Sequence, residues 1–324
     1  MKGLLKVRNL TKRFRVGGGL LRKSSFLTAV EDVSFDVPAG TTFGLVGESG
    51  CGKSTLGRCI LGLEPLDSGS VNLDGTELYG LGKAGLFALR RRMQAIFQDP
   101  YSSLSPRRTI AQTLLEPLET HSIGDSQSRF ERVVQLLEMV GLRESVLHRY
   151  PHEFSGGQRQ RVGIARALAL QPDFVVADEA VSALDVSVQS QVLNLLRGIQ
   201  EEHGLSFLFI SHDLAVVQHI SDNVGVMYLG QLVEVGAADA VFWSPRHPYT
   251  EALIEAVPIA DPNHTTGGNA LQGEVPSPLK KPSGCAFHTR CPKAFDRCSV
   301  DVPKLEFNDP DNPSHGVRCH LFSA

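Results

Sequence analysis

Blocks of apolar residues alternate with polar and glycine-containing stretches along the first two thirds of this chain. Residues 4–46 carry short apolar runs separated by turn signals, and TTFGLVG at 41–47 predicts a buried strand that leads into a glycine-rich turn. The apolar run FVVA at 174–177 predicts another buried strand, and FLFI at 207–210 a third. These runs predict a sheet with a buried core.

Two segments carry apolar residues at helical spacing instead. The first extends from Ser128 to Gly141, a natural helix stop, and its apolar positions are Phe130, Val133, Val134, Leu137 and Val140. The second lies between the strands predicted at 174–177 and 207–210, and its apolar positions are Val188, Val192, Leu195, Leu196 and Ile199. The order strand, helix, strand predicts a parallel sheet and an α/β fold.

Composition narrows the classes of protein. The chain has 324 residues, of which 42% are apolar and 21% charged, which excludes a mainly disordered or fibrous protein. Its 32 basic and 35 acidic side chains give a formal charge of -3, so no overall positive field points to nucleic acid or an anionic membrane. No apolar stretch approaches the ~18 residues of a spanning helix, and no signal core is evident at the start, so we expect the chain to fold in the cytosol. Beyond Trp243, closely spaced prolines break regular structure, and we place a linker near residues 256–275.

The stretch GESGCGKST directly after the first predicted strand fits a phosphate-binding loop. Glycines let backbone N–H groups turn toward phosphate oxygens, and the start of the following helix adds its dipole. Lys53 would reach the β- and γ-phosphates, and the Ser54 hydroxyl would bind magnesium. A chance glycine-rich turn is the alternative. The candidate nucleotide-binding residues of this loop are Gly47, Glu48, Ser49, Gly50, Cys51, Gly52, Lys53, Ser54 and Thr55.

Two carboxylates follow the strand predicted at 174–177. The sequence FVVADEA would deliver Asp178 toward the metal and Glu179 toward an attacking water, at the edge where open α/β sheets bind ligands. Taken alone, the segment is better interpreted as a solvated acidic turn; together with the phosphate loop, the interpretation as a nucleotide site is favoured.

A second helix start has the composition of an anion-binding site. FSGGQRQRVGIARAL at 154–168 places Ser155, Gly156, Gly157 and Gln158 where free N–H groups can face an anion. One chain already has its phosphate loop, so this second end requires a second nucleotide. Ordinary capping of the helix by Ser155 is the alternative.

These segments, together with DEAVSALD and SHD, resemble the ATP-binding cassette (ABC) family over residues 4–255. The resemblance implies a cassette at 1–255 with a RecA-like parallel core sheet, an antiparallel β subdomain and a helical subdomain inserted at about 90–170, followed by an extension at 256–324. It also implies head-to-tail pairs, in which the serine and glycines of one chain complete the other chain's site. Phe154 stands where the family has leucine, a conservative departure.

Further roles are carried over from the family one residue at a time. Gln98, in FQDPYSSLSP, matches the glutamine that senses the metal and the attacking water, and His212 matches the histidine that contacts the γ-phosphate. Asp185 matches the aspartate of the segment that crosses the dimer interface, and Phe14 matches the aromatic residue that stacks on adenine. Taken alone, these four would be, in the same order, a polar loop residue, a structural histidine, a helix cap and a core residue. The mechanism implied is in-line attack of water on the γ-phosphate, with magnesium held by Ser54, Gln98 and Asp178 and with Lys53, Glu179, Gln98 and His212 as the catalytic set.

Within the family, QDPYSSLSPR, DEAVSALDVSVQSQVLNLL and HPYTEALIEAVP resemble the ATPases of dipeptide and oligopeptide importers, although Ala180 stands where proline is common. The resemblance implies a second cassette, two membrane permeases and an extracytoplasmic solute-binding protein as partners, no nucleic acid, and a peripheral place on the cytoplasmic face of the membrane. Related importers carry nickel or other small solutes. Two alternatives belong to other classes of function. One is a soluble cassette ATPase that acts on nucleic acid or ribosomes, and the other is a redox switch built on the four cysteines at 285–319, here called the cysteine tail.

Four of the six cysteines lie close to the end of the chain. Cys285, Cys291, Cys298 and Cys319 are separated by five, six and twenty residues, which is unlike the paired knuckles of zinc sites. Their spacing alone leaves an iron–sulfur cluster, zinc and free thiols open, and His288, His315 and His320 could serve zinc. The importer resemblance implies a 4Fe-4S cluster. We expect Cys51 and Cys59 to be packing residues.

Overall fold

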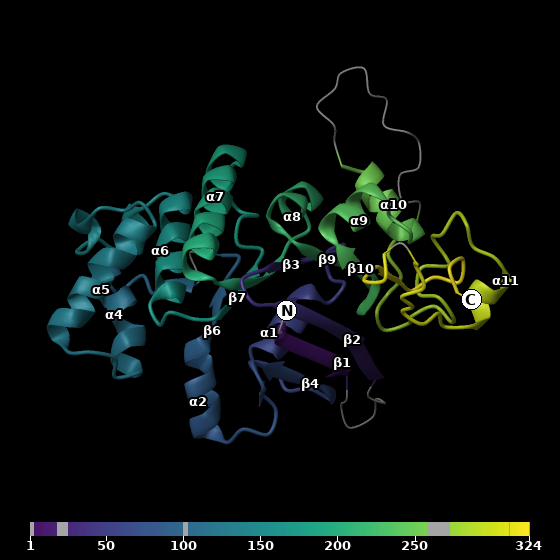
Figure 1. Cartoon of the computed structure of the whole chain (residues 1–324), viewed down its shortest axis with the longest axis horizontal. Helices are drawn as coiled ribbons and strands as arrows, with labels where there is room; N and C mark the ends of the chain where they lie inside the picture. The colour runs from purple at the N-terminus through teal and green to yellow at the C-terminus, as the bar shows by residue number, and fades with distance from the viewer. Residues whose placement is uncertain (1–2, 18–24, 100–102, 258–272, 311, 324) are drawn as a thin grey trace, which may run out of the picture. The chain divides into compact units, whose positions relative to one another are not determined.

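The computed structural model describes residues 3–17, 25–99, 103–257, 273–310 and 312–323 (Figure 1). The chain divides into two compact units. The first unit is built mainly from Leu73–Ile210. The second unit is built from Lys6–Asp36, Thr42–Asn72 and Ser211–Ala324. The linker predicted near 256–275 lies mostly outside the described residues.

The first unit combines parallel strands with helices. Its elements are β5 (Thr76–Glu77), α2 (Lys83–Arg92), β6 (Met93–Ile96), α4 (Ile110–Thr120), α5 (Ser126–Met139), two 3-10 turns (Glu144–Val146 and Pro151–Glu153), α6 (Gly156–Leu168), β7 (Phe174–Asp178), α7 (Val186–His203) and β8 (Ser206–Ile210). Strands β6, β7 and β8 pair in parallel, with Ile96 opposite Ala177 and Asp178 opposite Ile210. The apolar runs of β7 and β8 are buried, as expected for strands covered on both faces. Both predicted strands are therefore confirmed.

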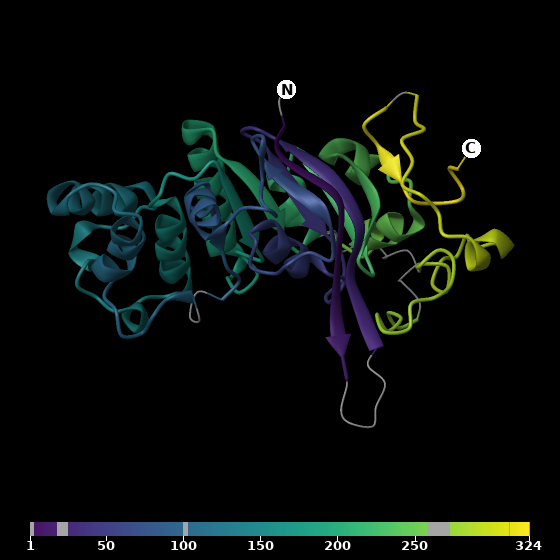
Figure 2. The same cartoon turned by 90° about the horizontal axis from the view of Figure 1, so that it is seen from below.

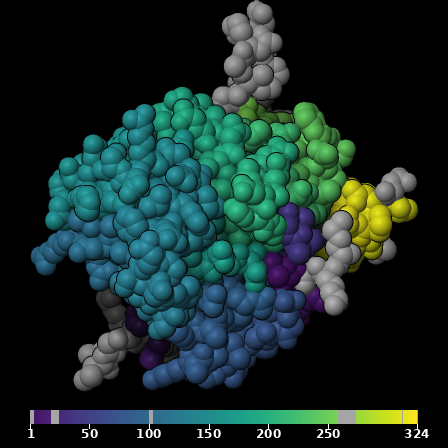
Figure 3. All heavy atoms as spheres, turned by 60° about the vertical axis from the view of Figure 1, so that its left-hand side comes forward, coloured from purple at the N-terminus to yellow at the C-terminus, as the bar shows by residue number. Residues whose placement is uncertain are grey.

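Helices α4, α5 and α6 pack against one another and present a broad face to solvent (Figures 1 and 3). The helix predicted from Ser128 is present as α5, which begins with a capping box between Asp125 and Ser128. The predicted apolar face is partly wrong, because Phe130 is 43% exposed whereas Leu136 is fully buried. Helical spacing alone did not separate these two positions.

Helix α7 matches the second predicted apolar stripe. It begins after Asp185 and ends at Gly204, whose φ of +64° favours glycine. Val192, Leu196 and Ile199 are buried. Among the described residues, no helix is both long enough and apolar enough to cross a bilayer.

The second unit holds two sheets. Its elements are β1 (Gly3–Val16), β2 (Ser25–Pro38), β3 (Thr42–Val46), α1 (Lys53–Ile60), β4 (Ser68–Leu73), α8 (Leu214–Ile220), β9 (Asn223–Tyr228), β10 (Gln231–Ala237), α9 (Ala238–Trp243), α10 (Pro248–Glu255), α11 (Asp296–Val300) and β11 (Gly316–Val317). One sheet has the order β2-β1-β4, and Figure 2 shows β1 and β2 running side by side. In the other sheet, β3 pairs in parallel with β9, β9 pairs antiparallel with β10, and β10 with β11.

The end of the chain contributes directly to the second sheet, through the pairing of Val317 with Glu234. The Glu234 side chain is fully buried and accepts hydrogen bonds from the backbone N–H groups of Arg246 (2.7 Å) and His247 (3.0 Å). Its carboxylate also lies 2.7 Å from Nε2 of His315. A buried carboxylate with several partners ties this part of the tail to the sheet, which the proline-rich sequence did not indicate.

Candidate functional site

The phosphate loop follows β3 and needs glycine at two positions. Gly47 has φ +150° and Gly52 has φ +108°. A Cβ atom on Gly47 would lie 2.1 Å from the carbonyl oxygen of Met227, and one on Gly52 would lie 2.2 Å from that of Ala29. Backbone therefore approaches backbone too closely for any side chain at either position.

Lys53 is the first residue of α1, and its side chain lies inside the loop. The residue is 5% exposed, and its ammonium group donates to the carbonyl oxygens of Gly47 (2.6 Å) and Glu48 (3.1 Å). Ser54 and Thr55 occupy the same first helical turn, at the end of α1 that carries the positive end of the helix dipole. The arrangement concentrates positive charge at one helix N-terminus, which suits a phosphate group.

Residues distant in sequence hold the loop from outside. The Glu48 carboxylate accepts two hydrogen bonds from Arg290, and the Glu48 N–H donates to the Tyr249 hydroxyl at 3.0 Å. Neither Tyr249 nor Arg290 was predicted from the sequence as a site residue, since no local pattern connects either residue to the loop. Cys51 and Cys59 are buried, and burial raises the pKa of both thiols, that of Cys59 to about 11.

In the first unit, the carboxyl ends of β6 and β7 bring two predicted residues together. Nε2 of Gln98 donates to Oε2 of Glu179 at 2.7 Å. Asp178 ends β7, and Glu179 has φ +49°, which is uncommon for a residue other than glycine. Residues other than glycine with such a backbone conformation are concentrated at functional sites. The positive φ therefore supports a functional role for Glu179, directly after the end of β7.

Ser155 and Asp185 act as helix caps within this chain. The Ser155 hydroxyl accepts from the Gln158 N–H at 3.3 Å, and Asp185 accepts from the Val188 N–H at 2.9 Å. The hydrogen bond from the Val188 N–H lowers the pKa of Asp185. Capping is the alternative that the sequence left open for both residues, and it is compatible with a further contact to a nucleotide on another cassette. That contact stays a prediction.

The remaining predicted residues lie in the second unit. His212 is exposed, two residues after the end of β8. Phe14 is half-buried in β1, and the Lys12 ammonium lies 4.8 Å from the centre of its ring. The second unit thus carries the phosphate loop, Phe14, His212 and the cysteine tail, and the first unit carries Gln98, Ser155, Gly156, Gly157, Gln158, Asp178, Glu179 and Asp185.

The four tail cysteines are free thiols. Burial raises the pKa of Cys285 and Cys291, and it raises that of Cys319 to about 11. Charge on the other three tail cysteines adds to the rise in the pKa of Cys319.

The cysteines nonetheless do not assemble a metal site. In the part of the chain that the structure describes, which includes all four, no group of three or more His, Cys, Asp or Glu could hold a metal ion. The histidines offered as zinc ligands have other contacts, His288 with the Cys285 carbonyl, His315 with Glu234 and His320 with the Asp301 carbonyl. The side chains as placed therefore do not support the predicted cluster.

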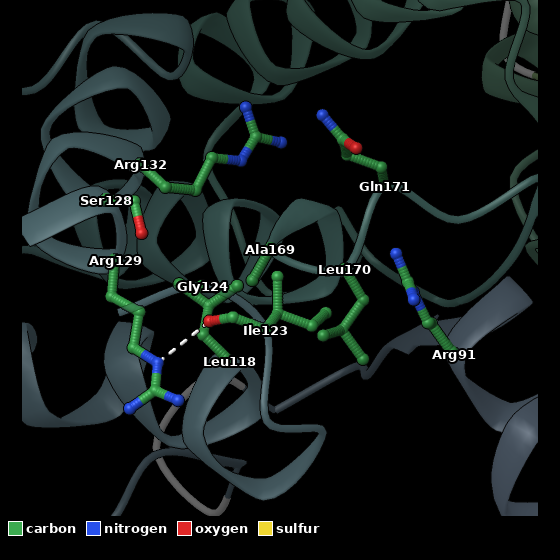
Figure 4. Close-up of a pocket in the computed structure, with 10 residues that line it drawn as sticks. All are labelled: Arg91, Leu118, Ile123, Gly124, Ser128, Arg129, Arg132, Ala169, Leu170 and Gln171. Atoms are coloured by element: carbon green, nitrogen blue, oxygen red, sulfur yellow. Dashed lines mark hydrogen bonds between the residues drawn. The ribbon is translucent and has the colours of Figure 1, made fainter. Parts of the chain in front are cut away.

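A pocket of about 190 Å³ lies in the first unit, and its lining residues include none of those predicted for the nucleotide (Figure 4). Arg91, Arg129 and Arg132 line it together with apolar side chains, and Nε of Arg129 donates to the Ile123 carbonyl at 2.8 Å. Arg129 is therefore already engaged at the pocket wall.

Comparison with known proteins places these features in context. The ABC transporter profile matches residues 30–182, and a profile described as the oligopeptide/dipeptide transporter C-terminal region matches residues 233–298. A peptide ABC transporter ATP-binding protein of Sinorhizobium fredii is 54% identical over 98% of this chain and 90% of its own length. An oligopeptide transport ATP-binding protein of Bacillus subtilis is 48% identical over 99% of this chain and 98% of its own.

Solved structures agree. A dimeric ATP-binding cassette in a post-hydrolysis state with ADP and phosphate matches with a TM-score of 0.65 and 28% identity, over 72% of this chain and 98% of that one. A component of an ABC transporter complex from Clostridium perfringens matches with a TM-score of 0.66 and 26% identity, over 75% of this chain and 92% of that one. These matches confirm the predicted cassette fold.

Proposed function

The chain belongs to the ABC transporter family of ATP-binding proteins, and from this membership we propose that it is the ATP-hydrolysing subunit of an importer for dipeptides or oligopeptides. The observation that carries the proposal is the similarity over nearly the whole chain to peptide-transport ATP-binding proteins, cysteine tail included. The match of residues 233–298 to a peptide-transporter C-terminal region supports peptides over nickel or another solute. No feature favours the soluble ATPase acting on nucleic acid or ribosomes, and the net charge of -3 argues against it.

The residues of the chain suit in-line attack of water on the γ-phosphate. Lys53 and the N–H groups at the start of α1 bind the phosphates, and Glu179, held by Gln98, orients the water and accepts its proton. Ser54, Asp178 and Gln98 carry the side-chain oxygens that magnesium prefers as ligands, and these three residues would hold the ion. When bound, magnesium would offset the charge that develops on the phosphates. His212 would contact the γ-phosphate and Phe14 the adenine.

We further propose that the cassette works as a head-to-tail pair. Ser155, Gly156, Gly157 and Gln158 would then face the nucleotide held by a second ATPase subunit, and Asp185 would lie at the interface. Support comes from the exposed, locally capped helix start of α6 and from the similarity to a cassette solved as a dimer. Two permeases and a solute-binding protein would complete the importer, with this subunit on the cytoplasmic face of the membrane. The domain boundary at residue 255 belongs to the same proposal.

Replacing Glu179 tests the proposed chemistry directly. Glu179→Gln keeps the shape of the side chain but removes the proton acceptor, so we expect ATP binding to persist while hydrolysis falls by on the order of 100-fold or more. Lys53→Ala is the matched comparison, because it should weaken binding itself. ATP binding and phosphate release are measured on the full-length protein with its partner subunits. Hydrolysis close to wild type in Glu179→Gln would remove Glu179 from this role.

The 4Fe-4S cluster that the importer resemblance implies stays a prediction. Among the described residues, no group of three or more His, Cys, Asp or Glu could hold a metal ion. Thiolates are required for ligation, whereas burial favours the protonated thiols. Anaerobic purification followed by visible absorption and iron analysis tests it. Colourless, iron-free protein would exclude the cluster.

A further inference from the structure

The segment that carries the tail cysteines contacts the phosphate loop through Arg290. Arg290 precedes Cys291, and its two terminal nitrogens donate to the two carboxylate oxygens of Glu48 at 2.8 and 3.0 Å. The Arg290 side chain is 5% exposed and the Glu48 side chain 25%. Two parallel charge-assisted hydrogen bonds fix both the position and the orientation of a carboxylate. The second residue of the loop is therefore held by a residue 242 positions away.

Glu48 connects this ion pair to the functional lysine. Its carbonyl oxygen accepts from the Lys53 ammonium at 3.1 Å and from the Cys51 N–H at 3.3 Å. Its N–H donates to the hydroxyl of Tyr249. Any movement of the Glu48 backbone thus moves an acceptor of Lys53 and changes the closure of the loop.

Aromatic packing keeps the arginine in place. Tyr228, Tyr249 and Phe287 form a cluster with ring centres 4.7 to 5.3 Å apart, and Phe287 is only 1% exposed. The Arg290 guanidinium lies 5.9 Å from the centre of the Tyr228 ring. Because Phe287 and Arg290 are close in sequence, burial of the phenylalanine fixes the backbone that presents the arginine. The guanidinium is thereby preorganised for Glu48.

We propose that Arg290 is a positioning residue for ATP binding, which acts through Glu48 on the loop carbonyls that orient Lys53. The inference rests on the proposed function, because it concerns the loop that we expect to bind the triphosphate. Without Arg290, the Glu48 carboxylate loses the partner that holds it beside the loop. Arg290 shapes the loop before the reaction, so its loss affects binding more than the chemical step.

The test compares two tail variants in the full-length chain. Arg290→Ala removes the contact to the loop, and Lys293→Ala is the matched control, since Lys293 forms an ion pair with Glu251 instead. We expect Arg290→Ala to raise KM for ATP about tenfold with kcat changed less than about twofold, and Lys293→Ala to match wild type. Arg290→Lys should recover only part of the loss, because a lysine lacks the two-pronged geometry.

Two further measurements separate positioning from general damage. Glu48→Gln, which leaves Arg290 intact, should raise KM similarly, and the double variant should be no worse than either single one. In nucleotide-free protein, amide hydrogen exchange at residues 47–53 should accelerate in Arg290→Ala but not in Lys293→Ala. The proposal would be overturned if Arg290→Ala and Glu48→Gln changed neither the amide hydrogen exchange at residues 47–53 nor the KM for ATP. It would also be overturned if Lys293→Ala raised the KM for ATP as much as Arg290→Ala. If wild type fails to hydrolyse ATP while the exchange difference persists, the proposed function falls and the positioning role stands.

Discussion

The phosphate loop and the start of α6 both offer a helix N-terminus to an anion, yet they are built differently. Lys53 in the loop is almost fully buried, and Glu48 is held by Tyr249 and Arg290, which lie 201 and 242 residues further along the chain. Ser155 at the start of α6 is exposed, and its capping partner Gln158 is three residues away.

This contrast separates two ways of preparing a binding group. Long-range contacts fix the conformation of the loop before any ligand arrives, so the loop loses less conformational entropy when a ligand binds. The local capping box satisfies the helix start without the rest of the fold and leaves it exposed. An exposed, locally ordered element is suited to complete a site on a second chain, whereas the buried loop is suited to bind within its own.

The largest effect that would test this contrast is expected at Ser155. Ser155→Ala should cost about 1 kcal/mol of stability by removing a helix cap. If the residue also faces the nucleotide of a second cassette, ATP hydrolysis by the assembled pair should fall on the order of 100-fold.

Thr109→Ala provides the control for Ser155→Ala, because Thr109 forms the same capping box with Gln112 at the start of α4. It should cost a similar stability and leave hydrolysis unchanged. Thermal unfolding and steady-state hydrolysis of both variants measure the difference. Equal rates of ATP hydrolysis in the two variants would mean that Ser155 only caps the helix and does not face the nucleotide of a second cassette.

A smaller effect should appear at acidic pH in the support of the loop. His247 is buried, its Nδ1 accepts from the Tyr249 N–H at 3.0 Å, and burial lowers its pKa to about 4. Since this pKa lies below the unfolded value, the stabilising contribution is present above pH ~6.5 and is lost as pH falls toward 4. Between pH 7 and pH 5 the loss should be about 2 kcal/mol.

His247→Asn is the comparison, because asparagine can accept the same hydrogen bond without taking up a proton. Urea unfolding at pH 7 and pH 5 should show the wild type losing about 2 kcal/mol more than this variant. A pH dependence shared by both proteins would mean that other groups dominate. The described residues around the start of α6 include no such buried histidine, so this acid sensitivity should be confined to the region that supports the loop.

Much of the fold followed from local pattern. The runs at 41–47, 174–177 and 207–210 became buried strands because uninterrupted apolar segments of that length must be covered on both faces. The side of α5 that faces the core did not follow from spacing, since Phe130 satisfies the same spacing as the buried positions yet is exposed. Periodicity defines a stripe, but the neighbouring helices decide its edges.

The sequence by itself determined the phosphate loop, because the spacing of Gly47, Gly52 and Lys53 within a few residues is sufficient to identify it. The two glycines meet a steric requirement, and Lys53 supplies the positive charge. Only the tertiary structure decided what holds that loop, since Arg290 and Tyr249 reach Glu48 from more than 200 residues away. It also decided that the end of the chain joins the sheet through β11. Contacts between distant segments depend on how the whole chain folds back on itself, and neither periodicity nor a local motif says which distant residues will meet.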